Sequence, residues 1–256
     1  MKKISRRSFL AAAAVSAAAL ALTACGGSAS TASSAAASSV AVSSEAASTS
    51  AAAAELTTVE AGKLTMATNA TFPPYEMTTD AGTIEGIDVD TAQAIAEKLG
   101  LELQIDDMDF DAALLSVQQG KADIAMAGIT VTDERMAVMS FSDSYATGIQ
   151  SVIVPEGSDI ASVDDLVGKK IGTQRGTTGY LYCSDDFGED AVVAYDSGLT
   201  AVQALNNGQV DAVVIDNEPA KAYVESNPGL KILDTSYAEE DYAIGMNKSN
   251  TALLEL

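Results

Sequence analysis

From Lys63 onward, short apolar runs alternate with helical patterns, and this alternation most constrains the fold. Leu64–Ala67 is a strand pattern, and the helical pattern after it begins at about Asp88 and is closed by Gly100. We expect the Asp88 side chain to cap this helix. A βαβαβ order requires a parallel sheet that helices cover, so we predict an α/β fold. The remaining elements of this half are a strand at 101–105, a helix at about 111–119 and a strand at 123–127.

The pattern restarts after Tyr145, which indicates a second unit of the same kind. A weak internal repeat supports this, because Leu114–Ile124 parallels Val202–Ala212. In that register Gly128 lies opposite Asp216, and both follow the carboxyl end of a buried strand, where open α/β sheets bind ligands. Chance similarity between helix–glycine–strand units is the alternative. The second half has strand patterns at 150–154, 170–173, 191–194 and 211–215, with a helix that Ser197 caps and Gly208 ends.

The first 24 residues have the pattern of an export signal. Four basic residues precede an apolar run at 9–22 that is too short to span a membrane. Ser5–Leu10 resembles a twin-arginine signal, and Leu22–Gly26 resembles the lipobox of bacterial lipoproteins. The second resemblance implies that Cys25 becomes the lipid-bearing N-terminus after cleavage. An ordinary small residue near the cleavage site is the alternative for Cys25.

A segment rich in Ala, Ser, Thr and Gly follows the predicted signal. It cannot bury enough apolar surface to offset the entropy of ordering, so we expect 25–60 to be a lipidated cysteine with a flexible tether. A lipid and a tether together predict a soluble domain that is anchored to the outer face of the cell membrane, or that lies in the periplasm.

Charge and composition exclude several classes of function. The predicted signal holds four basic residues and no acid, so its removal takes the net charge from −22 to −26. A chain this acidic repels nucleic acid, and we expect no nucleic-acid partner. The chain has no histidine, which removes the commonest metal ligand and general base, and we expect no metal and no cofactor. Cys183 is the only cysteine besides Cys25, so we expect it in the core rather than in a disulfide.

An anion-binding pattern lies between the two halves. The strand pattern at 123–127 ends at Gly128, which lets the backbone approach a ligand closely. Thr130 offers a hydroxyl, and Arg135 offers a guanidinium that can hold a carboxylate through two parallel hydrogen bonds. Thr132 is the expected N-cap of a helix with acids in its first turn. A strand, a turn and a helix with a surface arginine are the alternative reading of this stretch.

Several motifs together carry a family resemblance. In their order and spacing they resemble the bacterial extracellular solute-binding proteins of family 3, the polar amino acid receptors of ABC importers, such as glutamine-, histidine- and arginine-binding proteins. The resemblance covers residues 63–256. The motifs are Ala67–Glu76, Gly86–Asp90, Met108–Phe110, Gly128–Arg135, Phe141–Tyr145, Gly176–Gly179 and Asp211–Asp216.

The resemblance implies a type II periplasmic-binding-protein-like fold. This fold has two lobes, each a mainly parallel sheet flanked by helices, joined by a two-stranded hinge. We expect the first lobe at 61–146 plus 243–256 and the second at 147–242, with hinge strands at 145–150 and 240–244. The resemblance further implies a monomeric extracytoplasmic receptor, not an enzyme, that closes on a free polar amino acid and delivers it to an ABC permease in the membrane.

The resemblance also implies the residues of the binding site. Arg135 holds the α-carboxylate, helped by Thr130 and the main chain near Gly128. Asp216 in the other lobe holds the α-ammonium, and Thr178 at a helix start adds an amide and a hydroxyl. Two aromatic residues form walls around the ligand side chain or, alternatively, only pack the core. The full expected set is Asn69, Phe72, Phe110, Ala127, Gly128, Thr130, Arg135, Gln174, Thr178 and Asp216, with Phe72 and Phe110 as the aromatic pair.

The sequence departs from the family pattern at two places. Asn69 stands where many members have an acid, which favours a neutral polar ligand over arginine or lysine. The chain stops at Leu256, inside a helix that begins near Ser249, where relatives continue further, so we expect a fragment or an incomplete first lobe. Tyr75 and Glu76 are expected to hold loop structure near the cleft. A dehydratase of the cyclohexadienyl or arogenate type and a sensory ligand-binding domain are the alternative functions.

Overall fold

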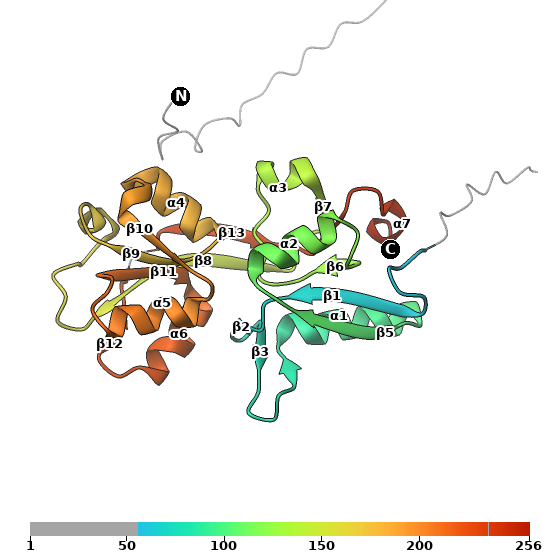
Figure 1. The fold of residues 1–256 in the computed structure, drawn as a ribbon, viewed down its shortest axis with the longest axis horizontal. Helices are drawn as coiled ribbons and strands as arrows, with labels where there is room; N and C mark the ends of the chain where they lie inside the picture. Colours follow the sequence, from blue (N-terminus) through green and yellow to red (C-terminus); the bar gives the residue numbers. More distant parts are fainter. Residues whose placement is uncertain (1–55, 235) are drawn as a thin grey trace, which may run out of the picture. The chain divides into compact units, whose positions relative to one another are not determined.

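The computed structural model describes residues 56–234 and 236–256 (Figure 1). The predicted export signal, Cys25 and most of the predicted tether lie outside these residues. Within the described ranges no helix has the length and apolarity that crossing a membrane requires. The same ranges contain no group of three or more acids or cysteines placed to hold a metal ion.

The first lobe is built on a five-stranded sheet with the order β5–β1–β6–β14–β7. β1, β5 and β6 are parallel, as the βαβαβ pattern predicts, and β14 runs antiparallel to β6 and β7. α1 and α2 lie on opposite sides of β1 (Figure 1). Leu64 and Met66 pack with α1 and Ala67 packs with α2, because successive side chains of a strand point to opposite faces. The elements of this lobe are β1 (Lys63–Thr68), β2 (Thr71–Phe72), β3 (Glu76–Thr78), β4 (Ile84–Glu85), α1 (Ile87–Leu99), β5 (Glu102–Asp107), α2 (Phe110–Gln118), β6 (Ile124–Ala125), α3 (Asp133–Val138), β7 (Met139–Phe141), β14 (Gly245–Asn247) and α7 (Thr251–Leu254).

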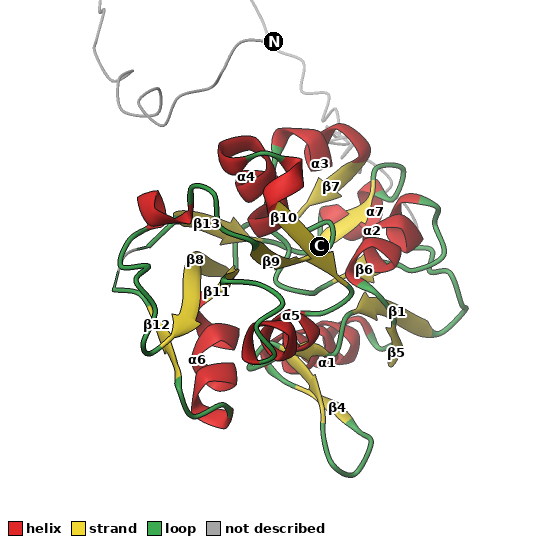
Figure 2. Ribbon diagram, turned by 60° about the vertical axis from the view of Figure 1, so that its left-hand side comes forward, coloured by secondary structure: helices red, strands yellow, loops and turns green. Residues whose placement is uncertain are grey.

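The second lobe is built on a sheet with the order β10–β9–β11–β8–β12, and β13 also pairs with β8. β11 alternates between two apolar clusters: Val213 and Ile215 pack with α5 and α6, whereas Val214 packs with α4. Figure 2 shows α4 and α6 on opposite sides of these strands in a second view. The elements are β8 (Ala146–Pro155), η1 (Val163–Leu166), β9 (Ile171–Gln174), α4 (Thr178–Phe187), η2 (Glu189–Ala191), β10 (Val192–Tyr195), α5 (Gly198–Asn206), β11 (Ala212–Asp216), α6 (Asn217–Ser226), β12 (Leu230–Ile232) and β13 (Ala238–Tyr242).

Two antiparallel strands connect the lobes. The chain passes from β7 of the first sheet into β8 of the second, and it returns from β13 to β14. β8 and β13 pair from Ala146 opposite Tyr242 to Gln150 opposite Ala238. The predicted two-lobed α/β architecture with a two-stranded connection is therefore confirmed. In each sheet, antiparallel strands lie beside the parallel ones. They arise because the chain crosses between the lobes and then runs through a sheet in the opposite direction.

Local signals set most helix ends, with one exception. Thr132 caps α3 and Ser197 caps α5, each accepting a backbone N–H three residues on, as predicted. Gly100 is left-handed after α1, which confirms the predicted end of that helix. The capping role predicted for Asp88 is wrong, because Gly86 is the N-cap of α1 and the Asp88 side chain is fully buried. An alanine at Gly86 would place its Cβ 2.2 Å from a backbone oxygen, so only glycine fits there.

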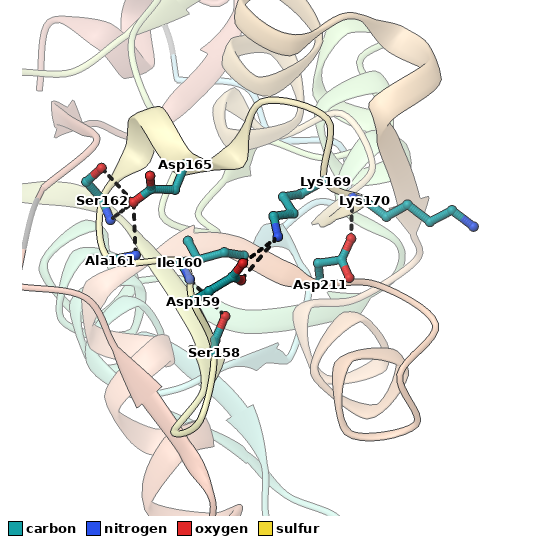
Figure 3. A network of polar contacts seen from close by, with 9 residues as sticks. All are labelled: Ser158, Asp159, Ile160, Ala161, Ser162, Asp165, Lys169, Lys170 and Asp211. Atoms are coloured by element: carbon teal, nitrogen blue, oxygen red, sulfur yellow. Dashed lines mark hydrogen bonds and ion pairs between the residues drawn. The ribbon is translucent and has the colours of Figure 1, made fainter.

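Polar contacts far from the cleft hold the long connection between β8 and β9 (Figure 3). Ser162 and Asp165 form a reciprocal capping box at η1, and backbone and hydroxyl donors lower the pKa of Asp165. Lys169 pairs with Asp159 at 3.1 Å. The backbone N–H of Lys170 donates to a carboxylate at the start of β11, at 2.7 Å. These contacts are exposed, and they order the loop rather than form a site.

The last residues of the predicted tether contact the first lobe. Leu56 packs against the cluster under α1, and the backbone N–H of Val59 donates to Asp123 Oδ1 at 2.8 Å. A second oxygen of the same carboxylate accepts from the N–H of Thr65 in β1 at 2.8 Å. The ordered part of this lobe therefore extends at least to Leu56, before the expected boundary at residue 61.

Candidate functional site

One pocket between the lobes brings all the predicted site residues together. The strand ends, loops and helix starts that surround it come from both sheets, as expected for the carboxyl ends of parallel strands. Two residues that the sequence did not assign to the ligand, Glu76 and Thr177, also line it. The pocket is lined by Asn69, Phe72, Glu76, Phe110, Ala127, Gly128, Thr130, Arg135, Gln174, Thr177, Thr178 and Asp216.

Arg135 is the central cation of the pocket. It lies in α3, directly after the cap at Thr132, and its side chain is buried. Its guanidinium donates to the backbone oxygen of Thr130 at 2.7 Å and to that of Gly176, in the other lobe, at 3.1 Å. It also lies 5.3 Å from the centre of the Phe110 ring. Burial lowers the pKa of this guanidinium. Among the described residues, no acid lies within 4.0 Å of it, so its charge is available to an incoming carboxylate.

Asp216 is the acid that the second lobe contributes to the pocket. It ends β11, directly before α6, and its side chain does not cap that helix. The hydroxyl of Tyr242 donates to its Oδ1. Burial raises the pKa of Asp216 to about 7, and the nearby charge of Glu240 also raises it. An ammonium group placed here would favour the ionised carboxylate.

Glu240 is a buried acid that the sequence analysis missed. It lies in β13, and its Oε2 accepts from the hydroxyl of Thr130 at 3.1 Å and from Nε2 of Gln150 at 2.9 Å. It thus connects the loop that contains Thr130, in the first lobe, with β8 and β13, the two strands that join the lobes. Its spacing gives a signal that could have found it, since Glu240 and Tyr242 lie two residues apart on the buried face of one strand.

A buried pair of acids lies beside the pocket. Glu76 is fully buried, and burial together with the facing Asp88 raises its pKa well above the usual value. Burial also raises the pKa of Asp88, whose Oδ2 accepts from the N–H of Gly128 at 3.2 Å and from the hydroxyl of Tyr145 at 2.9 Å. These partners draw Asp88 inward and explain why it does not cap α1. Two neighbouring buried carboxyls cannot both be ionised at low cost, which favours the protonated form of Glu76.

The two aromatic residues lie both at the pocket and in the core, and their predicted contact with a ligand side chain stays a prediction. Phe72 and Phe110 line the pocket, and each also belongs to an apolar core cluster. Phe72 stacks on Tyr75 with ring centres 5.7 Å apart, and Tyr75 meets Tyr242 edge-on at 5.4 Å. The aromatic walls are therefore fixed by the packing behind them.

The cleft is closed, because its polar groups bond across it. Gln174 Nε2 donates to Asn69 Oδ1 at 2.9 Å, and the hydroxyls of Thr130 and Thr178 lie 3.5 Å apart. The cavity that remains measures about 10 Å³, space for a single water molecule. An amino acid can enter only if the lobes separate or the side chains rearrange.

Outside the pocket, the remaining predictions for single residues have clear outcomes. Cys183 lies on the buried face of α4, as expected, and burial raises the pKa of its thiol to about 12. Asp107, at the end of β5, accepts from the N–H of Ala70 at 2.8 Å and so fixes the loop after β1. Glu76, which we expected only to hold loop structure near the cleft, also lines the pocket.

Comparison with known proteins decides the family. A family description, the bacterial extracellular solute-binding proteins, family 3, matches residues 64–256. The chain belongs to this family. Its members are solute-binding proteins rather than enzymes, and membership places the chain outside the cytoplasm. It also confirms the type II two-lobed fold that the resemblance implied.

Relatives of this family member are named for amino acids. A probable histidine-binding protein of Neisseria gonorrhoeae is 32% identical over 197 residues, which cover 75% of this chain and 74% of the relative. The truncated, arginine-bound form of ArgBP from T. maritima is 41% identical, with a TM-score of 0.72, over 76% of this chain and 92% of the other. An ancestral arginine-binding protein bound to glutamine is 40% identical, with a TM-score of 0.71, over 77% and 88%.

Proposed function

We propose that this solute-binding protein captures a free polar amino acid outside the cell, closes its two lobes around it and delivers it to the permease of an ABC importer. One observation carries the proposal: a buried cation, Arg135, and a buried acid, Asp216, line one pocket from different lobes, and neither has an ion partner among the residues that the structure describes. An amino acid zwitterion carries the two complementary charges. Only the closed form can hold both ends of it, and exclusion of water strengthens both pairs.

Each lining residue has a role in this proposal. Arg135 and the Thr130 hydroxyl hold the α-carboxylate, and Thr178 adds a hydroxyl and the N–H of a helix start from the other lobe. The main chain at Ala127 and Gly128 approaches the ligand closely. Phe72 and Phe110 enclose the ligand side chain, and Asn69 and Gln174 lie at its far end. The proposed lobes are 61–146 with 243–256 and 147–242; the sheet to which each segment belongs supports this division, and the contacts of Leu56 and Val59 extend the first lobe toward the tether.

Arginine is the amino acid we propose first. The expectation of a neutral ligand rested on Asn69, whose amide is already bonded to Met108 O, Thr71 and Gln174. Glu76 lines the pocket and can supply the negative charge that Asn69 lacks, since a cationic side chain would favour loss of its proton. The relatives named for arginine and histidine agree with this choice. Glutamine is the second candidate, because Asn69 and Gln174 offer amides and an arginine-binding relative has been solved with glutamine.

The anchor and the assembly state complete the proposal. Cys25 carries the lipid, and the segment that follows it tethers a monomeric binding domain to the outer face of the cell membrane. The lipobox-like sequence and the compositional bias of the segment support this.

A thermal-shift screen against the twenty amino acids tests the proposed function. A ligand at a hundredfold its dissociation constant adds about 2.7 kcal/mol of stability. We expect arginine to give the largest shift and glutamine a smaller one, with calorimetry supplying the affinities. A screen in which no amino acid raises the melting temperature would contradict the function, and a larger shift with glutamine would contradict the choice of arginine.

A further inference from the structure

A contact between the lobes lies outside the pocket. Tyr223, on α6 of the second lobe, donates its hydroxyl to the backbone oxygen of Thr71, in β2 of the first lobe. Tyr223 does not line the pocket, and its side chain is only 7% exposed. Its ring belongs to one apolar cluster with Phe72 and Tyr75 of the first lobe and with residues of α5. The contact therefore combines a hydrogen bond with apolar packing. Separation of the lobes would expose this apolar surface.

We propose that Tyr223 is a latch that stabilises the closed form and so sets the affinity and the release rate of the amino acid without contacting it. Both partners of this hydrogen bond lie close in the chain to residues that line the pocket. α6 begins directly after Asp216, and Thr71 precedes Phe72. The hydroxyl of Thr71 also bonds to Asn69, the residue that receives the cross-lobe bond inside the pocket.

The energetic argument follows from linkage between closing and binding. The affinity for a ligand that binds the closed form scales with the fraction of protein able to close. Removing the Tyr223 hydroxyl leaves the partly buried oxygen of Thr71 without this donor in the closed form, whereas water reaches that oxygen when the lobes part. The open form is favoured as a result. Side-chain recognition is unaffected, since no pocket residue changes.

The first test is Tyr223→Phe, which removes only the hydroxyl. It rests on the proposed function, because it measures amino acid binding. We expect the affinity for arginine to fall about two- to tenfold, through faster dissociation, with the ratio of arginine to glutamine affinity unchanged. Tyr237→Phe is the matched control, since it removes a hydroxyl bond to Asp186 within the second lobe. Equal affinity and dissociation in the two variants, or a changed ratio, would overturn the latch.

The second test needs no amino acid. Spin labels on Leu115→Cys in α2 and Leu181→Cys in α4, both exposed positions in different lobes, report the distance across the cleft. The full chain carries Cys25→Ser, and buried Cys183 is not labelled. We expect Tyr223→Phe, but not Tyr237→Phe, to move the distribution to longer distances. An unmoved distribution overturns the latch. A shift in a protein that binds no amino acid supports the latch while the proposed function fails.

Discussion

Arg135, Asp216 and Glu76 are ionisable side chains that line the pocket, are buried, and have no oppositely charged partner within 4.0 Å among the described residues. At the scale of the residue, an ionised side chain buried without a partner costs folding free energy. The raised pKa of Glu76 favours its neutral form, which reduces this cost, and Arg135 reduces it by donating to backbone oxygens. A ligand of opposite charge would offset the cost at Arg135 and Asp216 and would favour the ionised form of Glu76.

Arg135→Ala should abolish amino acid binding and leave the fold intact. The buried carboxylate of the ligand would lose a charge-assisted pair whose removal costs about 2–5 kcal/mol, which is a factor of about 30 or more in affinity. Calorimetry measures this, with Arg175→Ala as the control, since that guanidinium is 56% exposed and pairs with Asp196. Unchanged affinity in Arg135→Ala would refute its assignment to the carboxylate.

Binding should weaken as the pH falls below about 7. Burial raises the pKa of Asp216 to about 7, and a ligand ammonium needs the ionised form, so binding below that pH must displace a proton. The affinity should fall by up to tenfold per pH unit below 7. Without ligand the sign is opposite: the folded chain holds this proton more tightly than the unfolded chain, so the stability gained from it is lost as the pH rises through about 7.

Calorimetry between about pH 5.5 and pH 8 measures this dependence. Asp216→Asn is the decisive comparison, because it should bind more weakly at neutral pH but show a flatter pH profile. Glu76 and Asp88, whose pKa values burial also raises, remain in that variant, so a small residual slope is expected from them. An equally steep slope in Asp216→Asn would show that another group titrates.

At the scale of the element, short segments at the ends of strands bring the lobes together. The loop before α4 contacts α2 across the cleft: a Cβ added at Gly176 would lie 1.6 Å from Oδ1 of Asp111, in the first turn of α2. The guanidinium of Arg135 reaches the backbone oxygen of the same glycine. These contacts connect the start of α4 with the first lobe only when the cleft is closed.

Gly176→Ala should therefore weaken binding more than it weakens the fold. The matched control is Gly208→Ala. Gly208 has a left-handed φ of 67°, close to the 73° of Gly176, but a Cβ added at Gly208 would meet no other atom within 4 Å. Both variants should lose roughly 1 kcal/mol of stability from backbone strain. Only Gly176→Ala should lower the affinity, and Asp111→Ala in the same chain should restore part of it. Equal affinities in the two glycine variants would show that the loop does not have to approach α2.

At the scale of the whole molecule, closure and anchoring are separate properties. Closure involves β8, β13 and the surfaces around the pocket, all among the described residues. The proposed anchoring rests on Cys25 and the segment after it, most of which lies outside the described residues. Such an anchor would raise the local concentration of the binding domain at the membrane.

Cys25→Ser should release the protein from the membrane or leave the precursor unprocessed. The proposed anchor depends on a thioether to that one sulfur, and serine cannot form it. Fractionation of cells at high salt, with immunodetection, measures the result. Cys183→Ser is the control, because Cys183 is buried in the second lobe and should not affect partitioning. A Cys25→Ser variant that stays with the membrane would contradict the lipoprotein assignment.

The sequence by itself determined the elements and the pocket. Apolar periodicity and caps such as Thr132, Ser197 and Gly100 act within a few residues, so they leave a readable local pattern. The ten residues chosen from motifs all line one pocket, because they follow the carboxyl ends of neighbouring strands. The order of elements was enough to place those ends together.

Only the tertiary structure decided which polar side chains turn inward. Asp88 faces inward because Gly128 and Tyr145, 40 and 57 residues away, donate to it, and Glu240 is buried because Thr130, 110 residues away, does the same. The bond from Tyr223 to the Thr71 oxygen spans 152 residues. The sequence does not show which residues become partners over such separations, since the chain between them sets no constraint on their spacing, although the alternation along β13 marks Glu240 as facing inward. The closed cleft depends on long-range contacts of this kind, and they form only once both lobes have folded.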